Sequence, residues 1–151
     1  MNRRRLRESQ PILIVEDSAD DFEATKRAFN KANLRNVIVH ALSGEDALGY
    51  LSSRIAVKPG LILLDLNMPG QDGRTTLQII KRSPELKKIP VVILTTSDDE
   101  RDVKACYELG ANTYIQKPVD FDGLICAIRQ LKEYWFEIAL LPKGADSDGG
   151  D

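Results

Sequence analysis

The sequence predicts an α/β fold in which five parallel strands alternate with five helices, a (βα)5 doubly wound sheet with helices on both faces. Two observations predict it. Short apolar runs of strand length recur along the chain, and each is followed by apolar residues at helical spacing. In addition, the apolar run 61–64 leads directly into Asp65, with a Pro-Gly pair close behind. Such a run is typical of a strand buried on both faces of a parallel sheet.

The first half of the chain supplies three strands and two helices. The predicted strands cover residues 11–15, 37–39 and 61–65. Ser18 can cap the first helix, which has acidic residues in its first turn and ends near Ala32 and Asn33. Residues 43–46 begin the second helix.

The second half continues the alternation with strands over 90–94 and 113–116. A third helix carries Thr76, Leu77, Ile79 and Ile80. The fourth begins with acidic residues 98–100 and stops at Gly110, in the position of a left-handed C-cap. The final helix, capped by Asp120, is expected to reach about Leu141, before Pro142.

Composition excludes several classes of function. The net charge of −2 gives no electrostatic case for binding nucleic acid or an anionic membrane, and no apolar run approaches the length of a membrane span. Cys106 and Cys126 lack metal or redox spacing, so reduced thiols in the cytoplasm are expected. One histidine makes a Ser-His-Asp triad or a His-rich metal site unexpected.

A single domain is expected between residues 10 and 141. Residues 1–9 form the predicted flexible basic tail, which includes Arg3-Arg4-Arg5 but no apolar segment of a secretory signal. Residues 142–151 are acidic and glycine-rich, and are predicted to be disordered.

Polar side chains follow four of the five strands at the carboxyl edge of the predicted sheet. They are Glu16 and Asp17, Asp65, Thr95 and Lys117. Taken singly, these residues also fit a strand exit, a turn threonine or a surface lysine. Because parallel strands end at the same edge, however, we expect all five to converge.

The chemistry of this group favours phosphoryl transfer. Three neighbouring carboxylates repel one another, and a divalent cation with oxygen ligands, Mg²⁺ rather than a softer metal, would compensate. Lys117 and Thr95 could then bind phosphoryl oxygens while Asp65 acts as the nucleophile that forms an aspartyl-phosphate.

Four motifs resemble the response-regulator receiver domain of two-component signalling over residues 10–141. They are ILIVEDS at 12–18, LILLDLNMPGQDG at 61–73, PVVILTTS at 90–97 and YIQKP at 114–118. The resemblance implies the strand order 2-1-3-4-5 and phosphorylation of Asp65 by a sensor histidine kinase.

The resemblance also implies further roles. Glu16 and Asp17 would form the acidic pocket, and Asp17, Asp65 and the Asn67 backbone carbonyl would bind Mg²⁺. Tyr114 matches a switch position that turns inward as Thr95 moves to the phosphate. The Lys117-Pro118 bond matches a peptide that is cis in the family.

Two features suggest the subtype. No output domain follows the last helix, so a stand-alone receiver is expected. The helix ending, with LTTS and VEDSADD, resembles the small response regulators paired with bacterial phytochromes. A homodimer is implied through the fourth helix, the fifth strand and the C-terminal helix, where Tyr134, Trp135 and Phe136 are consecutive and cannot share one face. Alternatively, Trp135 caps the core and the other two lie on the surface.

Two rival functions stay open. One is an enzyme, an aspartate phosphatase or phosphotransferase with Asp65 as covalent nucleophile, although position 67 holds an amide where such enzymes need an acid/base carboxylate. The other is a degenerate receiver that binds a partner constitutively, which fits poorly with a full set of pocket residues. A receiver without enzymatic turnover is the favoured interpretation.

Overall fold

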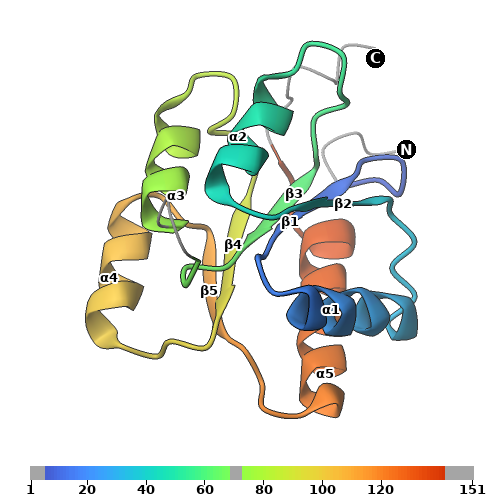
Figure 1. The fold of residues 1–151 in the computed structure, drawn as a ribbon. Coiled ribbons are helices and arrows are strands. Elements are labelled where there is room, and N and C mark those ends of the chain that lie inside the picture. Colours follow the sequence, from blue (N-terminus) through green and yellow to red (C-terminus); the bar gives the residue numbers. More distant parts are fainter. Residues whose placement is uncertain (1–5, 69–72, 142–151) are drawn as a thin grey trace.

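Five α-helices, one short π-helical segment and a five-stranded parallel sheet make up the computed structural model, which describes residues 6–68 and 73–141 (Figure 1). The strand order is β2-β1-β3-β4-β5, as expected. The strands are β1 (Ile12–Val15), β2 (Ile38–Ala41), β3 (Leu61–Leu64), β4 (Val91–Thr95) and β5 (Thr113–Gln116). The helices are α1 (Ala19–Lys31), α2 (Gly44–Ser52), α3 (Gly73–Arg82), α4 (Glu100–Glu108) and α5 (Phe121–Lys132).

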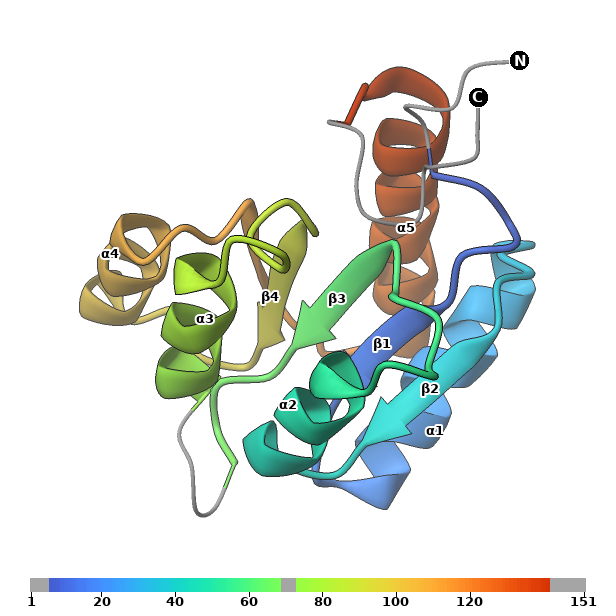
Figure 2. The same ribbon diagram turned by 90° about the horizontal axis from the view of Figure 1, so that it is seen from above.

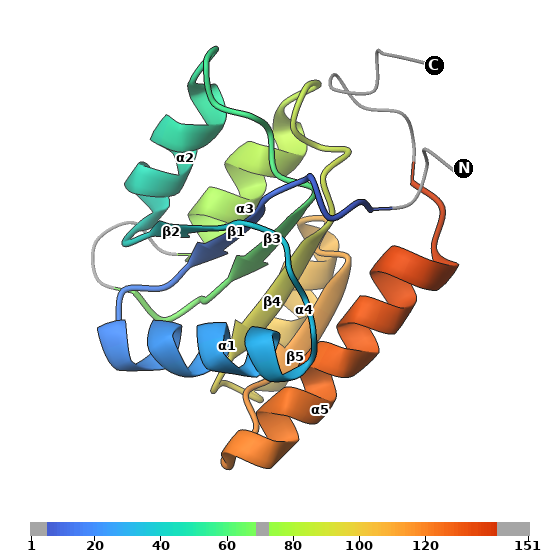
Figure 3. The same ribbon diagram turned by 90° about the vertical axis from the view of Figure 1, so that its right-hand side faces the viewer.

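The helices cover both faces of the sheet. α1 and α5 pack side by side on one face, whereas α2, α3 and α4 line the other (Figures 2 and 3). Alternate residues of each inner strand belong to different cores: Ile12 and Ile14 pack towards α1 and α5, while Leu13 and Val15 pack towards α2 and α3. The central strands β1, β3 and β4 are therefore buried on both sides, which explains why they read as continuous apolar runs.

Local signals set most helix boundaries. Ser18, Ser43 and Asp120 each accept a hydrogen bond from an amide of the first helical turn, as N-caps do. Gly110 has a φ of 107°, which confirms the left-handed position predicted after α4. The strand predicted over 37–39 instead spans Ile38–Ala41, because that stretch pairs in register with Ile12–Val15.

The predicted end of the last helix is wrong. A π-helical segment, Glu133–Ile138, follows α5 directly, and Ala139 adopts an extended conformation with its amide bonded to the Tyr134 carbonyl. The helix therefore ends before Leu141. Within this segment Trp135 is buried and Tyr134 is half exposed.

Residues 6–9, predicted as part of the flexible basic tail, pack on the domain, whereas residues 1–5 lie outside the described residues. Leu6 is buried against the core beside Gly60, and the Asn36 side chain donates to the backbone carbonyls of Arg7 and Gln10. Burial of one apolar side chain and these hydrogen bonds hold residues 6–9 on the domain. Residues 142–151, predicted to be a disordered acidic tail, lie outside the described residues.

Candidate functional site

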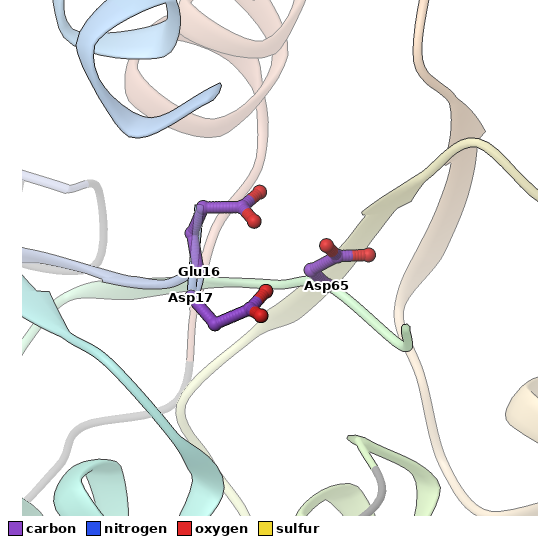
Figure 4. A group of neighbouring side chains, drawn as sticks. All are labelled: Glu16, Asp17 and Asp65. Atoms are coloured by element: carbon purple, nitrogen blue, oxygen red, sulfur yellow. The ribbon is translucent and has the colours of Figure 1, made fainter. Parts of the chain in front are cut away.

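Three carboxylates meet at the carboxyl edge of the sheet. Glu16 and Asp17 follow β1, and Asp65 follows β3, the adjacent strand. One oxygen from each lies within 4.8 Å of the others, and the side chains surround one space between the two strand ends (Figure 4). Glu16 and Asp65 are buried while Asp17 is exposed, so the group is open to solvent on one side.

Backbone hydrogen bonds continue the sheet to these residues. The Glu16 amide donates to the Ala41 carbonyl at 3.0 Å, and the Asp65 amide donates to the Val15 carbonyl at 3.1 Å. The carboxylates therefore project from backbone that the neighbouring strands fix in place. A site built on strand ends holds its geometry better than one on a free loop.

Lys117 is the cation of this group. Its ammonium lies 2.7 Å from Glu16 Oε1, 3.3 Å from Asp21 Oδ2 and 3.6 Å from Asp65 Oδ2. Its backbone amide donates to the Thr95 carbonyl at 2.7 Å, which ties the end of β5 to the end of β4.

Burial and neighbouring charges shift the pKa values of both Glu16 and Lys117. Burial raises the pKa of Glu16, and the neighbouring Asp65 charge adds to this while Lys117 opposes it. Burial alone would lower the pKa of Lys117, but the hydrogen bond to Glu16 and the charges of Asp65, Glu16 and Asp21 hold it above its ordinary value. The lysine is therefore fully charged at neutral pH and offsets part of the carboxylate repulsion.

Asn67 connects Asp65 with Thr95. The Asn67 amide donates to Asp65 Oδ1 at 3.2 Å, and its side-chain Nδ2 donates to the fully buried Thr95 Oγ1 at 3.3 Å. Sequence reasoning assigned a role only to the Asn67 carbonyl. The bond to Thr95 joins the ends of β3 and β4 and uses the Thr95 hydroxyl as an acceptor, so the hydroxyl hydrogen can still be donated to another group.

Tyr114 is half buried and reaches the segment after β4. Its hydroxyl donates to the Ser97 carbonyl at 2.9 Å. The Ser97 hydroxyl in turn donates to Asp102 Oδ2 at 2.7 Å, and Asp102 pairs with Arg74 at 2.8 Å. Through these contacts the predicted switch residue is linked to the start of α4 and to α3.

One implication of the family resemblance is not met. The peptide bonds among the described residues are all trans, and this includes Lys117-Pro118. Trans is the intrinsically favoured form of a bond to proline, by about 0.5–1 kcal/mol, and the Lys117 side chain reaches the carboxylates in this form.

Sequence reasoning missed two residues beside the site. Gly73 opens α3 so close to the chain that an added Cβ would lie 2.5 Å from the Asp65 carbonyl oxygen. His40, on a strand to which no role was given, has its Nε2 atom 2.7 Å from the Glu16 carbonyl oxygen. Neither contact leaves a signal in the sequence, since both depend on how separate segments pack.

The donor set fits a hard divalent cation. Three carboxylates within 4.8 Å of one another supply oxygen ligands, and the exposed Asp17 leaves room for retained water. Both Glu16 oxygens accept hydrogen bonds, Oε1 from Lys117 and Oε2 from the Ser18 amide. Asp17 and Asp65 are therefore better placed to bind the cation directly, with Glu16 holding Lys117.

The chain is similar to known signalling proteins over nearly its whole length. The family described as "Response regulator receiver domain" matches residues 12–129. "Response regulator Rcp1" of Synechocystis sp. is 38% identical over 142 residues, which cover 89% of this chain and 97% of that protein. No helix in the described part of the chain is long and apolar enough to cross a bilayer.

Solved structures agree with these sequence matches. The phosphorylated cyanobacterial phytochrome response regulator RcpA gives a TM-score of 0.83 at 37% identity, covering 89% of this chain and 99% of that one. The Mn²⁺-bound form of Rcp1 gives 0.80 at 37% identity, with the same coverage. The bacteriophytochrome response regulator AtBRR gives 0.69 at 42% identity, covering 91% of this chain and all of that one.

Proposed function

Because the chain belongs to the response regulator receiver domain family, we propose that it is a phosphorylation-activated response regulator whose phosphoacceptor is Asp65. The observation that carries the proposal is the arrangement around this carboxylate. Asp65 is buried at a strand end, lies within 4.8 Å of two further carboxylates, and has the Lys117 ammonium 3.6 Å away.

The transfer is an in-line displacement at phosphorus. An Asp65 oxygen attacks a phosphohistidine, a P–O bond forms, and the P–N bond breaks as the kinase histidine leaves with the electron pair. Asp17, Asp65 and the Asn67 carbonyl would hold Mg²⁺, which neutralises charge on the phosphoryl oxygens. Lys117 and Thr95 bind the remaining oxygens.

Two side chains couple the site to the rest of the fold. Thr95 moves towards the new phosphoryl group, and Lys117 shifts towards this group from Glu16. The phosphoryl group adds about 1.5 to 2 negative charges. Tyr114 and the start of α4 respond, because Tyr114 is bonded to the segment between β4 and α4. Output then passes through protein contact rather than turnover of a small substrate.

Phosphorylation in vitro tests the assignment. Wild-type protein treated with acetyl phosphate and Mg²⁺ should gain one acid-labile and base-labile phosphoryl group, detected by intact mass. Asp65→Asn should gain none, chelation should stop the wild-type reaction, and the exposed control Glu85→Gln should behave as wild type. Undiminished labelling of the Asp65 variant overturns the proposal, and repeated turnover of a phosphomonoester would favour the phosphatase alternative.

The partner is proposed to be a sensor histidine kinase of the phytochrome type. The support is that RcpA and AtBRR, 37% and 42% identical to this chain, are phytochrome and bacteriophytochrome response regulators. A cytoplasmic location follows for the proposed reaction. Phosphotransfer profiling against the kinases of the host identifies the partner.

A pocket of about 210 Å³ beside Lys117 is the proposed kinase contact. It lies between α1 and the segment leading into α5, and the Val119 side chain at its edge is fully exposed. Val119→Ser should slow transfer from the kinase but leave labelling by acetyl phosphate unchanged. Equal loss of both reactions would instead indicate damage to the site itself.

A homodimer is proposed through α4, β5 and the C-terminal helix. Tyr107, Tyr134 and Ile138 are at least half exposed on these elements. Trp135 is buried and Phe136 packs partly against the core, so Tyr134 is the one of these three consecutive aromatic residues that is available to a partner. Tyr134→Ser should shift the protein to monomer in sedimentation equilibrium, while Val119→Ser should not. An unchanged dimer for Tyr134→Ser contradicts this interface.

A further inference from the structure

His40 contacts the backbone of the acidic pair from the neighbouring strand. Its Nε2 atom lies 2.7 Å from the Glu16 carbonyl oxygen. Because a carbonyl oxygen only accepts, the hydrogen must reside on Nε2. His40 is the single histidine of the chain and lies in β2, opposite Ile14.

The imidazole is held in this orientation by Phe22 of α1. The two rings stack with their centroids 3.6 Å apart and their planes within 2° of parallel. A stacked ring loses the freedom to rotate about its last side-chain torsion, so its Nε2–H stays directed at the carbonyl.

Both polar groups of the Glu16 backbone are thus bound by β2. The Glu16 amide donates to the Ala41 carbonyl at 3.0 Å, and the Glu16 carbonyl accepts from His40. That carbonyl belongs to the peptide unit joining Glu16 to Asp17. Fixing this plane fixes how the two carboxylates are directed relative to Asp65.

We propose that His40 is a positioning residue of the cation site: its Nε2–H, stacked on Phe22, holds the Glu16–Asp17 peptide so that the two carboxylates converge with Asp65. This inference rests on the proposed function, since it assigns the residue to the Mg²⁺ and phosphoryl site. His40 itself touches neither the cation nor the phosphoryl group.

Calorimetric titration with MgCl₂ tests the inference. His40→Phe keeps an aromatic ring for Phe22 but removes the donor, and it should weaken Mg²⁺ binding about five- to tenfold, the value expected for loss of one hydrogen bond. His40→Gln places an amide N–H at a similar reach and should recover most of the affinity. Phe22→Leu, which keeps the imidazole but frees it to rotate, should give an intermediate loss.

The control is Ile38→Val, which trims a side chain two residues before His40 that packs against the core and lies opposite Ile12. It should lower the thermal midpoint and leave Mg²⁺ affinity unchanged. A purely structural His40 would show the same pattern as this control, whereas a positioning residue changes affinity beyond any change in stability.

The single histidine gives a second readout in metal-free protein. Nitrogen-15 spectra of the imidazole at pH 8 should show the proton on Nε2. A proton on Nδ1, or Mg²⁺ affinity of His40→Phe within twofold of wild type, overturns the inference. If wild-type protein itself fails to bind Mg²⁺, the proposed function fails instead, so the two failures are distinguishable.

Discussion

The Lys117 ammonium lies 2.7 Å from Glu16 Oε1, so the lysine that follows β5 is paired with the residue that follows β1, 101 positions earlier in the chain. Its distance to Asp65 Oδ2 is longer, 3.6 Å. Without a phosphoryl group, Lys117 therefore offsets carboxylate repulsion at the same place where a cation would do so.

Lys117→Met is expected to separate cation binding from phosphoryl recognition. Removing a positive charge a few ångströms from the cation should leave Mg²⁺ affinity unchanged or raise it, by up to about fivefold from a screened charge–charge term near 1 kcal/mol. Stabilisation by beryllofluoride in the presence of Mg²⁺ should be lost, because the ammonium no longer binds its fluorines.

Calorimetry and thermal melts with and without beryllofluoride measure both effects. Lys26→Met makes the same charge change on the exposed surface of α1 and should leave both unchanged. Strong loss of Mg²⁺ affinity in Lys117→Met would contradict the expectation and make the lysine part of the cation site.

Asp65→Asn is expected to stabilise the metal-free protein. Asp65 lies within 4.8 Å of the carboxylates of Glu16 and Asp17, and its charge contributes to the raised pKa of Glu16. Removing one of three like charges should raise the free energy of unfolding by about 1 kcal/mol in chelator. Added Mg²⁺ should then stabilise the variant less than wild type.

Urea unfolding in chelator and in Mg²⁺ measures the free energy of unfolding of Asp65→Asn and of wild type in each condition. Glu85→Gln, an exposed carboxylate-to-amide change in the segment after α3, should change stability in neither condition by more than about 0.5 kcal/mol. A less stable Asp65→Asn protein in chelator would show that Lys117 compensates the repulsion fully.

Gly73→Ala is expected to displace the backbone of Asp65. An alanine Cβ would lie 2.5 Å from the Asp65 carbonyl oxygen and 2.8 Å from Leu66 Cα, and both are backbone atoms that cannot rotate away. Such overpacking costs typically about 1–3 kcal/mol and should slow labelling by acetyl phosphate.

Gly49→Ala is the matched control, because it lies in α2 with nothing within 4 Å of the added methyl group. Helix propensity should make that variant more stable by up to about 1 kcal/mol. If Gly73→Ala is as stable and as readily labelled as wild type, the close approach of α3 to Asp65 is not a constraint.

The sheet and the convergence of five side chains could be predicted from the sequence because both follow from strand direction. Once β1, β3, β4 and β5 are parallel, the residues that follow them must share an edge. Capping residues such as Ser18 and Gly110 were predictable for a similar reason, since each acts within one turn of its own helix.

Contacts between distant segments could not be predicted in this way. The bond from His40 to the Glu16 carbonyl depends on the register of β2 against β1 and on the stacked ring of Phe22. Burial of Leu6 depends on the absence of a side chain at Gly60. The early end of the last helix depends on a π-helical segment in which Trp135 is buried. None of these changes the periodicity or the composition of the segment concerned.

Titration of Lys81 should make the free energy of unfolding depend on pH. Its ammonium donates to the carbonyls of Lys87 and Ile89 and to Asn112 Oδ1, at the edge of the sheet away from Asp65. Burial nevertheless lowers the pKa of Lys81 from 10.5 to about 8.

The sign of the effect follows from proton binding. Between pH 8 and 10.5 the unfolded chain binds more protons at Lys81 than the folded protein does, so the free energy of unfolding should rise with pH in this window. The limit is about 1.4 kcal/mol per pH unit, and partial exposure should reduce the total rise to roughly 1 kcal/mol. Urea unfolding at pH 7.5 and 9.5 measures it, with Lys81→Met expected to show no rise and the exposed control Lys104→Met expected to keep it. A flat profile for wild type would mean that the three acceptors stabilise the charged form enough to cancel the cost of burial, because hydrogen bonds to an ammonium favour its protonation while desolvation opposes it.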